Sequence, residues 1–535
     1  MSVSIKRSHY EVLGLCAGTL GILLVQALDQ PNSCAIEQPG IPVVAEIGIS
    51  LLLPELLKNT EDTTISALGS VVYDLYQEVA EFRRLNATAV DAAMRDLQSQ
   101  IFPLPLIKRV AYAFRVLIET SPKYRKHGWV KPALPFTMSS IKEFFSAIRL
   151  AGGFGGKRAR SSDNSTSNHD AYMLDLCGRI QVHIEVMSAI VGGDKESQQL
   201  AKDEGLLSAI LSNWTIMKMA HARGSQLMLH ALYLLANYSY GNDIARRSML
   251  TSLQAGSTKV SPNGGTQTLL SLLFGLATSR GEMAHQVARG ANTSSAGDMA
   301  VSNAACQVLK TALHNTECIL ASHKTGPLTK LIDSLRDRLK QDRQTSKTNH
   351  LETRNLANML GVLCSVASNE EGAGILYSSG ASVLSSVLDD VMQSSDEVIQ
   401  CSGCLFLRNL ALSRASKNHF AMWDKLLDIM IARCVRASSP GRVESTIVDY
   451  LSTALWSLVY DNQKARAVLL SRPTAVRSLQ QVLDFQSAGA CLSDTCLVFR
   501  HQCAYTHPFV AFSSYQNQLH RVHFHTTLLK TSSAY

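Results

Sequence analysis

Two short pairs of residues have spacings known from metal and redox chemistry. Cys401 and Cys404 have the Cys-x-x-Cys spacing of redox and metal sites. His183 and Glu185 have the His-x-Glu spacing of zinc deaminases, but no Pro-Cys-x-x-Cys follows to supply the remaining ligands. Both pairs lie in apolar stretches with helical periodicity. We therefore interpret them as parts of ordinary helix faces, with the cysteine pair packed in a core.

The C-terminal segment 486–535 combines Cys and His residues and abandons the helical period. These residues are Cys491, Cys496, His501, Cys503, His507, His520, His523 and His525. Their spacings fit no pair-plus-pair pattern of a zinc site. We expect an irregular, divergent tail without a metal ion.

A glycine-rich stretch, Gly152–Lys157, invites comparison with a phosphate-binding loop. Such a loop needs a Gly five residues before its Gly-Lys pair and a Ser or Thr after the Lys, whereas Ala151 and Arg158 stand at these positions. No other constellation joins a nucleophile to a base. The sequence therefore predicts no catalytic residue, no cofactor and no metal, and a protein that is not an enzyme.

Composition favours an all-α protein in a reducing compartment. Of the 535 residues, 46% are hydrophobic, 18% are charged and only 6% are aromatic, which suits helices packed by aliphatic residues. Several of the 12 cysteines, among them Cys177, Cys306 and Cys364, lie in apolar helical stretches, where a reduced Cys acts as a small core residue. The net charge of +8 is scattered and lacks interleaved aromatic residues, so we expect no nucleic-acid binding.

The apolar run Val12–Leu28 could be a signal peptide, a short membrane anchor or a buried repeat helix. The run is short, contains Gln26 and is bounded by Glu11 and Asp29. We favour the buried helix, and with it a cytoplasmic protein without stable membrane insertion.

Breaks in the apolar period divide the chain into four parts. We predict N-terminal helical repeats over 1–150, a flexible basic and Ser-rich linker over 151–170, armadillo-like repeats over 171–485, and the tail over 486–535. The predicted insertions within the repeats are loops at Ala255–Thr266, Ala288–Gly297 and His323–Pro327 and a charged, exposed helix at Leu331–Asp342.

Apolar helices with similar endings recur from Ala171 to Leu483. If Asn237, Ser365, Asn409 and Tyr460 are equivalent, they are 128, 44 and 51 residues apart. The first spacing is close to three periods of about 43, the range of armadillo and HEAT repeats. Each repeat has an apolar face that only a neighbour can cover, so repeats stack into a superhelix with a concave groove.

The same blocks resemble the armadillo family, whose third helix often carries a Trp four residues before a groove-lining Asn. Asn237 and Asn409 match the Asn, and Tyr233 and Leu405 stand at the Trp position. The match is degenerate elsewhere: Trp456 is followed by Tyr460, and Gly361 is followed by Ser365. The resemblance implies an all-α, right-handed superhelix of armadillo/HEAT-like repeats. It implies groove residues Asn237, Asn409 and Tyr460 and repeat-core residues Tyr233, Leu405 and Trp456.

Two C-terminal blocks, Gly403–Ser413 and Ala454–Leu470, look like the C-terminal region of the rotatin family. These are large armadillo-like proteins of centrioles and ciliary basal bodies, so the resemblance covers part of a longer protein. It implies a non-enzymatic scaffold that binds centriolar or basal-body proteins. An armadillo-type adaptor in nuclear transport or vesicle tethering is the closest alternative, and a membrane-anchored or helical hydrolase is an alternative of another class.

Overall fold

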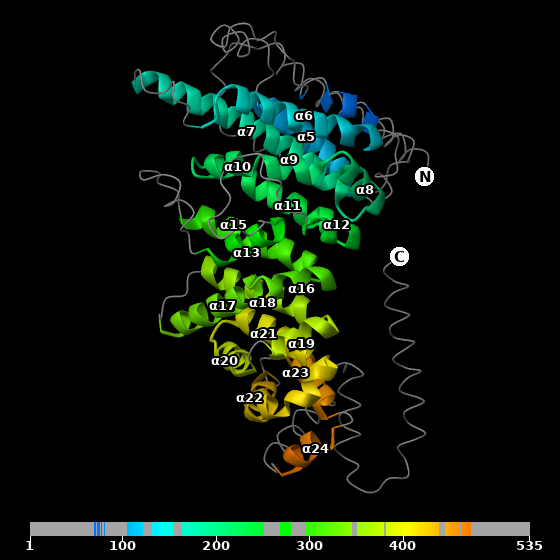
Figure 1. Cartoon of the computed structure of the whole chain (residues 1–535), viewed down its shortest axis with the longest axis vertical. Helices are drawn as coiled ribbons and strands as arrows, with labels where there is room; N and C mark the ends of the chain where they lie inside the picture. Colours follow the sequence, from blue (N-terminus) through cyan, green and yellow to red (C-terminus); the bar gives the residue numbers. More distant parts are fainter. Residues whose placement is uncertain are drawn as a thin grey trace, which may run out of the picture. The chain divides into compact units, whose positions relative to one another are not determined.

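A computed structural model describes scattered residues between 69 and 80 and the ranges 104–120, 130–154, 163–250, 268–279, 295–344, 350–378, 381–437, 445–459 and 462–471. No β-strand occurs in these ranges, and helices make up nearly all of them (Figure 1). The chain divides into two compact units. Unit 1 comprises 1–334 and 349–365, and unit 2 comprises 335–348 and 366–535.

The helices of unit 1 are arranged around a row of long helices. These long helices are α7 (Asp163–Val191), α11 (Leu227–Ser239), α15 (Ser295–Ala312) and α18 (His350–Ala367), the last of which continues into unit 2. Before and between them lie α5 (Leu104–Thr120), α6 (Val130–Leu150), α8 (Lys195–Asp203), α9 (Leu206–Ser212), α10 (Trp214–His221), α12 (Asp243–Ser248), α13 (Leu269–Thr278), α16 (Thr316–Lys324) and α17 (Pro327–Gln344), which continues into unit 2 from Leu335. In this row α7 packs against α11, and α11 packs against α15.

Unit 2 repeats the pattern with α21 (Glu397–Leu412) and α23 (Ser445–Val459) as its long helices, packed against each other. Its other elements are α19 (Glu370–Ser378), α20 (Ala381–Met392), the 3₁₀ segment η3 (Arg414–His419), α22 (Phe420–Ala437) and α24 (Gln463–Leu470). Leu407, Leu410, Leu451 and Leu455 are buried in this unit.

Short polar residues mark where a long helix ends and the next repeat begins. The capping residues are Asp194, Asn242, Asn315, Asn369 and Asn462. Each accepts a backbone N–H from the first turn of the following helix, as Asn242 does from Ile244 at 3.0 Å. Such caps stabilise a helix start by about 1 kcal/mol. The predicted all-α, armadillo-like repeat fold is thus confirmed, and its superhelical hand stays a prediction.

Three predicted segments differ in the structure. Helix α7 already begins at Asp163, so the expectation of a flexible linker up to Asp170 is wrong for these residues. Helix α6 packs against α7, which places the parts on either side of the expected linker in one core. Residues 323 and 324 belong to α16, and 295–297 belong to α15, rather than to loops.

The predicted charged helix at Leu331–Asp342 exists within α17, but it is not simply exposed. Leu331, Leu335 and Leu339 are buried on one face of this helix. Their spacing of four residues places them on a single stripe, so the charged residues occupy the other face. The run Val12–Leu28, the loop Ala255–Thr266 and the tail 486–535 lie outside the described residues.

Candidate binding groove on the long helices of unit 1

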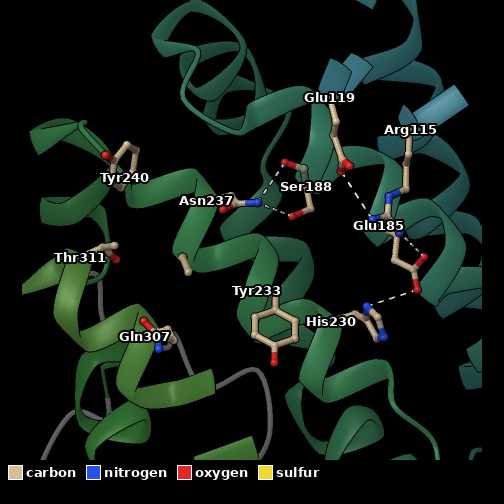
Figure 2. Close-up of a pocket in the computed structure, with 11 residues that line it drawn as sticks. Arg115, Glu119, Glu185, Ser188, His230, Tyr233, Asn237, Tyr240, Gln307 and Thr311 are labelled. Carbon is tan, nitrogen blue, oxygen red and sulfur yellow. Dashed lines mark hydrogen bonds and ion pairs between the residues drawn. The ribbon is translucent and has the colours of Figure 1, made fainter. Parts of the chain in front are cut away.

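Polar side chains join neighbouring long helices of unit 1. The Asn237 side-chain amide of α11 donates to Ser188 of α7, at 2.8 Å to Oγ and 3.3 Å to the backbone oxygen (Figure 2). On the other side of α11, the hydroxyls of Ser239 and Thr311 lie 2.6 Å apart, which joins α11 to α15. Side chains that cross between successive long helices therefore form a polar row.

A hollow of about 550 Å³ lies along this row. It is lined by Arg115, Glu119, Glu185, Ser188, His230, Tyr233, Ala236, Asn237, Tyr240, Gln307 and Thr311, which come from α5, α7, α11 with the residue after it, and α15 (Figure 2). A volume of this size accommodates a few side chains of a bound segment.

One end of the hollow holds a linked group of charged residues. Arg115 Nη1 donates to Glu185 Oε2 at 2.8 Å, and Arg115 Nη2 lies 3.5 Å from Glu119 Oε1. His230 Nδ1 lies 3.2 Å from Glu185 Oε1, the same oxygen that accepts from Gln181 at 2.9 Å. Glu185 is thus largely satisfied within the protein. The Glu119 side chain is 49% exposed and faces the hollow.

The electrostatics of this end favour a neutral His230. Burial lowers the pKa of His230, and the nearby Glu185 carboxylate opposes that shift. With His230 neutral, the charged lining residues are one arginine and two glutamates. This end of the hollow therefore carries a slight negative charge that favours a cationic side chain.

Tyr233 and Asn237 are neighbours on the exposed face of α11, one turn apart. Tyr233 is 44% exposed and stands edge-on to the His230 ring, with centroids 6.3 Å apart. The prediction that Tyr233 belongs to the repeat core is therefore wrong. The core tyrosine of α11 is Tyr238, which is fully buried because the helical period places it on the opposite face.

The other predicted site residues are distributed over unit 2. Asn409 and Leu405 on α21 and Trp456 on α23 are each partly exposed, so the predicted burial of Leu405 and Trp456 is only partial. The indole that is fully buried in this unit belongs to Trp423 on α22. Tyr460 lies outside the described residues. The structure therefore brings Asn237 and Tyr233 together in one hollow, while Asn409 lies in the other unit.

The two residue pairs with spacings known from metal and redox chemistry lie within the packing of the helices. His183 is buried among the rings of Tyr76, Phe136 and Phe144, and its Nδ1 lies 2.6 Å from the Tyr76 hydroxyl. Cys404 is buried and Cys401 is partly exposed on α21. Burial raises the pKa of the Cys177 thiol to about 12, which keeps it protonated and unreactive.

Within the part of the chain that the structure describes, no group of three or more His, Cys, Asp or Glu residues could hold a metal ion. In the same ranges, no helix combines the length and apolar character needed to cross a bilayer.

Sequence reasoning missed Lys310 on α15. Lys310 stands five residues before the cap Asn315, as Asn237 stands five residues before the cap Asn242. The two residues therefore hold equivalent positions in successive repeats. The capping residues could have revealed Lys310 from the sequence. A helix start is set by local hydrogen bonds, so the caps align the repeats more reliably than the degenerate Trp-Asn pattern.

No family model and no curated protein matches the chain. Among solved structures, a designed armadillo repeat protein in complex with the peptide (KR)4 is 15% identical, with a TM-score of 0.36, over 59% of this chain and 99% of its own. An engineered protein is also 15% identical, with a TM-score of 0.35, over 86% of this chain and 97% of its own. At these TM-scores the likeness adds no argument to the internal repeat.

Proposed function

We propose that the chain is a non-enzymatic scaffold and that the hollow on α7, α11 and α15 binds an extended segment of a partner protein. The observation that carries this proposal is the exposed Tyr233 ring beside Asn237 in a hollow of about 550 Å³. A large aromatic side chain held in a hollow loses little entropy on binding and contributes a large contact area.

Asn237 supports the same proposal through its hydrogen bonds. Its amide nitrogen is held by Ser188, which fixes the plane of the side chain before any ligand arrives. The residue is exposed, so its Oδ1 can accept a backbone N–H of a bound segment. A fixed amide beside an exposed ring matches an extended chain, which presents a backbone amide and a side chain in alternation.

The test is selection of 12-residue peptides from a random phage-displayed library on the immobilised full-length chain. We expect the selected peptides to bind Tyr233→Ala and Asn237→Ala proteins roughly tenfold more weakly, since an aromatic anchor contributes about 1–2 kcal/mol. Ile244→Ala is the matched control, because Ile244 is 53% exposed on α12 and does not line the hollow. Peptides whose affinity is unchanged by Tyr233→Ala would contradict the proposal.

We further propose a rotatin-like role in centriole assembly and basal-body organisation, supported by the resemblance of Gly403–Ser413 and Ala454–Leu470 to that family. A tagged full-length chain in ciliated cells should then co-localise with a centriolar marker and be recovered in the cytoskeleton fraction. Accumulation at the nuclear envelope or on vesicles would instead favour the transport or tethering adaptor.

A further inference from the structure

The side chain of Lys310 on α15 lies against Gly361 of α18, a residue without a side chain. Gly361 is in the interior of α18, and a Cβ built on it would lie 3.0 Å from Lys310 Nζ and 3.3 Å from Lys310 Cδ, with Cε closer still. A glycine in a helix interior costs about 1 kcal/mol relative to alanine. Here the missing side chain makes room for the stem of Lys310.

A chain of amides sets the direction of the Lys310 side chain. Its Nζ donates to Gln307 Oε1 at 3.4 Å, and Gln307 Nε2 donates to Asn358 Oδ1 at 2.9 Å. Asn358 in turn donates to Asn303 Oδ1 at 3.1 Å. Gln307 lines the hollow itself. The ammonium is therefore held within one helical turn of the hollow, on the α18 side of α15.

The Lys310 ammonium is held by an uncharged group. Among the residues that the structure describes, no carboxylate lies within ion-pair distance of its ammonium, whose hydrogen bond goes to the neutral Gln307 amide. Glu119 and Glu185 line the opposite end of the hollow, on α5 and α7. The hollow thus has carboxylates at one end, and the Lys310 ammonium lies beside its other end, next to the lining residue Gln307.

We propose that Lys310 is the anion-recognition position of this groove, and that the partner segment places an acidic side chain on it. The proposal rests on the proposed binding of a segment in the hollow. A segment that crosses from α7 to α18 would meet the carboxylates, then the Tyr233 ring, then the ammonium. Its matching sequence has a basic residue towards one end and an acidic residue towards the other. Gly361 is a positioning residue, because it acts only by leaving space for Lys310.

The experiment repeats the peptide selection on the wild-type chain, on Lys310→Glu and on Gly361→Ala. We expect wild-type peptides to be enriched in Asp or Glu at one position and the Lys310→Glu protein to lose that enrichment. The best acidic peptide should bind Lys310→Glu about fivefold more weakly, the size of one partly exposed ion pair. A second peptide, with phosphoserine in place of the Asp or Glu, distinguishes a carboxylate ligand from a phosphate ligand. Tighter binding of the phosphoserine peptide would identify a phosphorylated partner.

Gly361→Ala separates positioning from folding. It should weaken binding of the acidic peptide, as Lys310→Glu does, although the lysine is still present. Binding of a peptide with Asn in place of the acidic residue should not change. Gly275→Ala is the matched control, because Gly275 is also inside a helix, α13, but a Cβ there would meet no atom within 4 Å. That control should leave binding unchanged.

Two results would overturn the inference, and they differ in what else they imply. If peptides bind in a Tyr233-dependent way but show no acidic preference that Lys310→Glu removes, the role of Lys310 is wrong and the binding groove stands. If no selected peptide depends on Tyr233, the groove and the role of Lys310 are both wrong.

Discussion

The side chains that join neighbouring long helices differ between the two units. In unit 1, side-chain hydrogen bonds cross between helices, from Asn237 to Ser188 and from Asn355 to Ser302 and Asn303 at 3.0 and 2.9 Å. In unit 2, the Ser457 hydroxyl of α23 donates to the backbone oxygen of Ala411 of α21 at 2.8 Å, and the Arg408 guanidinium lies 5.2 Å from the centre of the Tyr450 ring.

This difference teaches that stacking of repeats tolerates either kind of contact. The apolar faces hold each repeat against the next, so the side chains that cross between long helices can differ from one repeat to another. In unit 1 they create a polar hollow with fixed amides. We therefore expect substitutions in unit 2 to act mainly on stability and substitutions along the unit 1 row to act on both stability and binding.

The largest effect is expected for Trp423→Ala in unit 2. Its side chain is fully buried, and truncation of a buried Trp costs about 3–5 kcal/mol through lost contacts and a cavity. Amide hydrogen exchange should accelerate in α20 and α22, with the α7 and α11 helices of unit 1 unchanged. Trp456→Ala is the comparison, since Trp456 is partly exposed and should cost less. A greater loss for Trp456→Ala would reverse our assignment of the core indole.

A smaller loss is expected for Asn355→Ala in unit 1. Asn355 is fully buried, and its amide donates to Ser302 and Asn303, so its removal breaks two hydrogen bonds between α18 and α15. Such a loss costs about 1–3 kcal/mol. Urea unfolding followed by circular dichroism measures it, with the exposed Asn237→Ala as control. Equal stability of the two variants would show that the buried row is not what joins these helices.

Unit 1 should also lose stability in acid through His183. Burial lowers the pKa of His183 from 6.5 to about 3, so the unfolded chain takes up a proton between these values and the folded chain does not. Stability should therefore fall as the pH drops through 6.5, by about 1 kcal/mol between pH 6.5 and 5.5. Unfolding free energies at pH 7.5 and 5.5 measure this. His183→Gln should remove that part of the pH dependence, and an unchanged slope would contradict it.

The smallest change in stability is expected for Tyr233→Ala. An exposed side chain away from caps and cores changes stability by about 0.5 kcal/mol or less, so this variant should unfold like the wild type while it binds the selected peptides roughly tenfold more weakly. Tyr238→Ala, five residues along the same helix, should be strongly destabilising because Tyr238 is fully buried. If both variants lose similar stability, Tyr233 belongs to the core after all.

The sequence by itself determined the helical repeats, because apolar periodicity and capping residues act within a few neighbouring positions. It also indicated Asn237, which is exposed and lines the hollow, while its role in binding a partner stays a prediction. Only the tertiary structure decided which of Tyr233 and Tyr238 is exposed, and which of Trp423 and Trp456 is fully buried. Burial depends on what the adjacent repeat places against each helix face, and the degenerate pattern in this chain leaves the register of each helix open. The contact of Lys310 with Gly361 was also decided by the tertiary structure, because it depends on α15 and α18 lying side by side at a residue without a side chain.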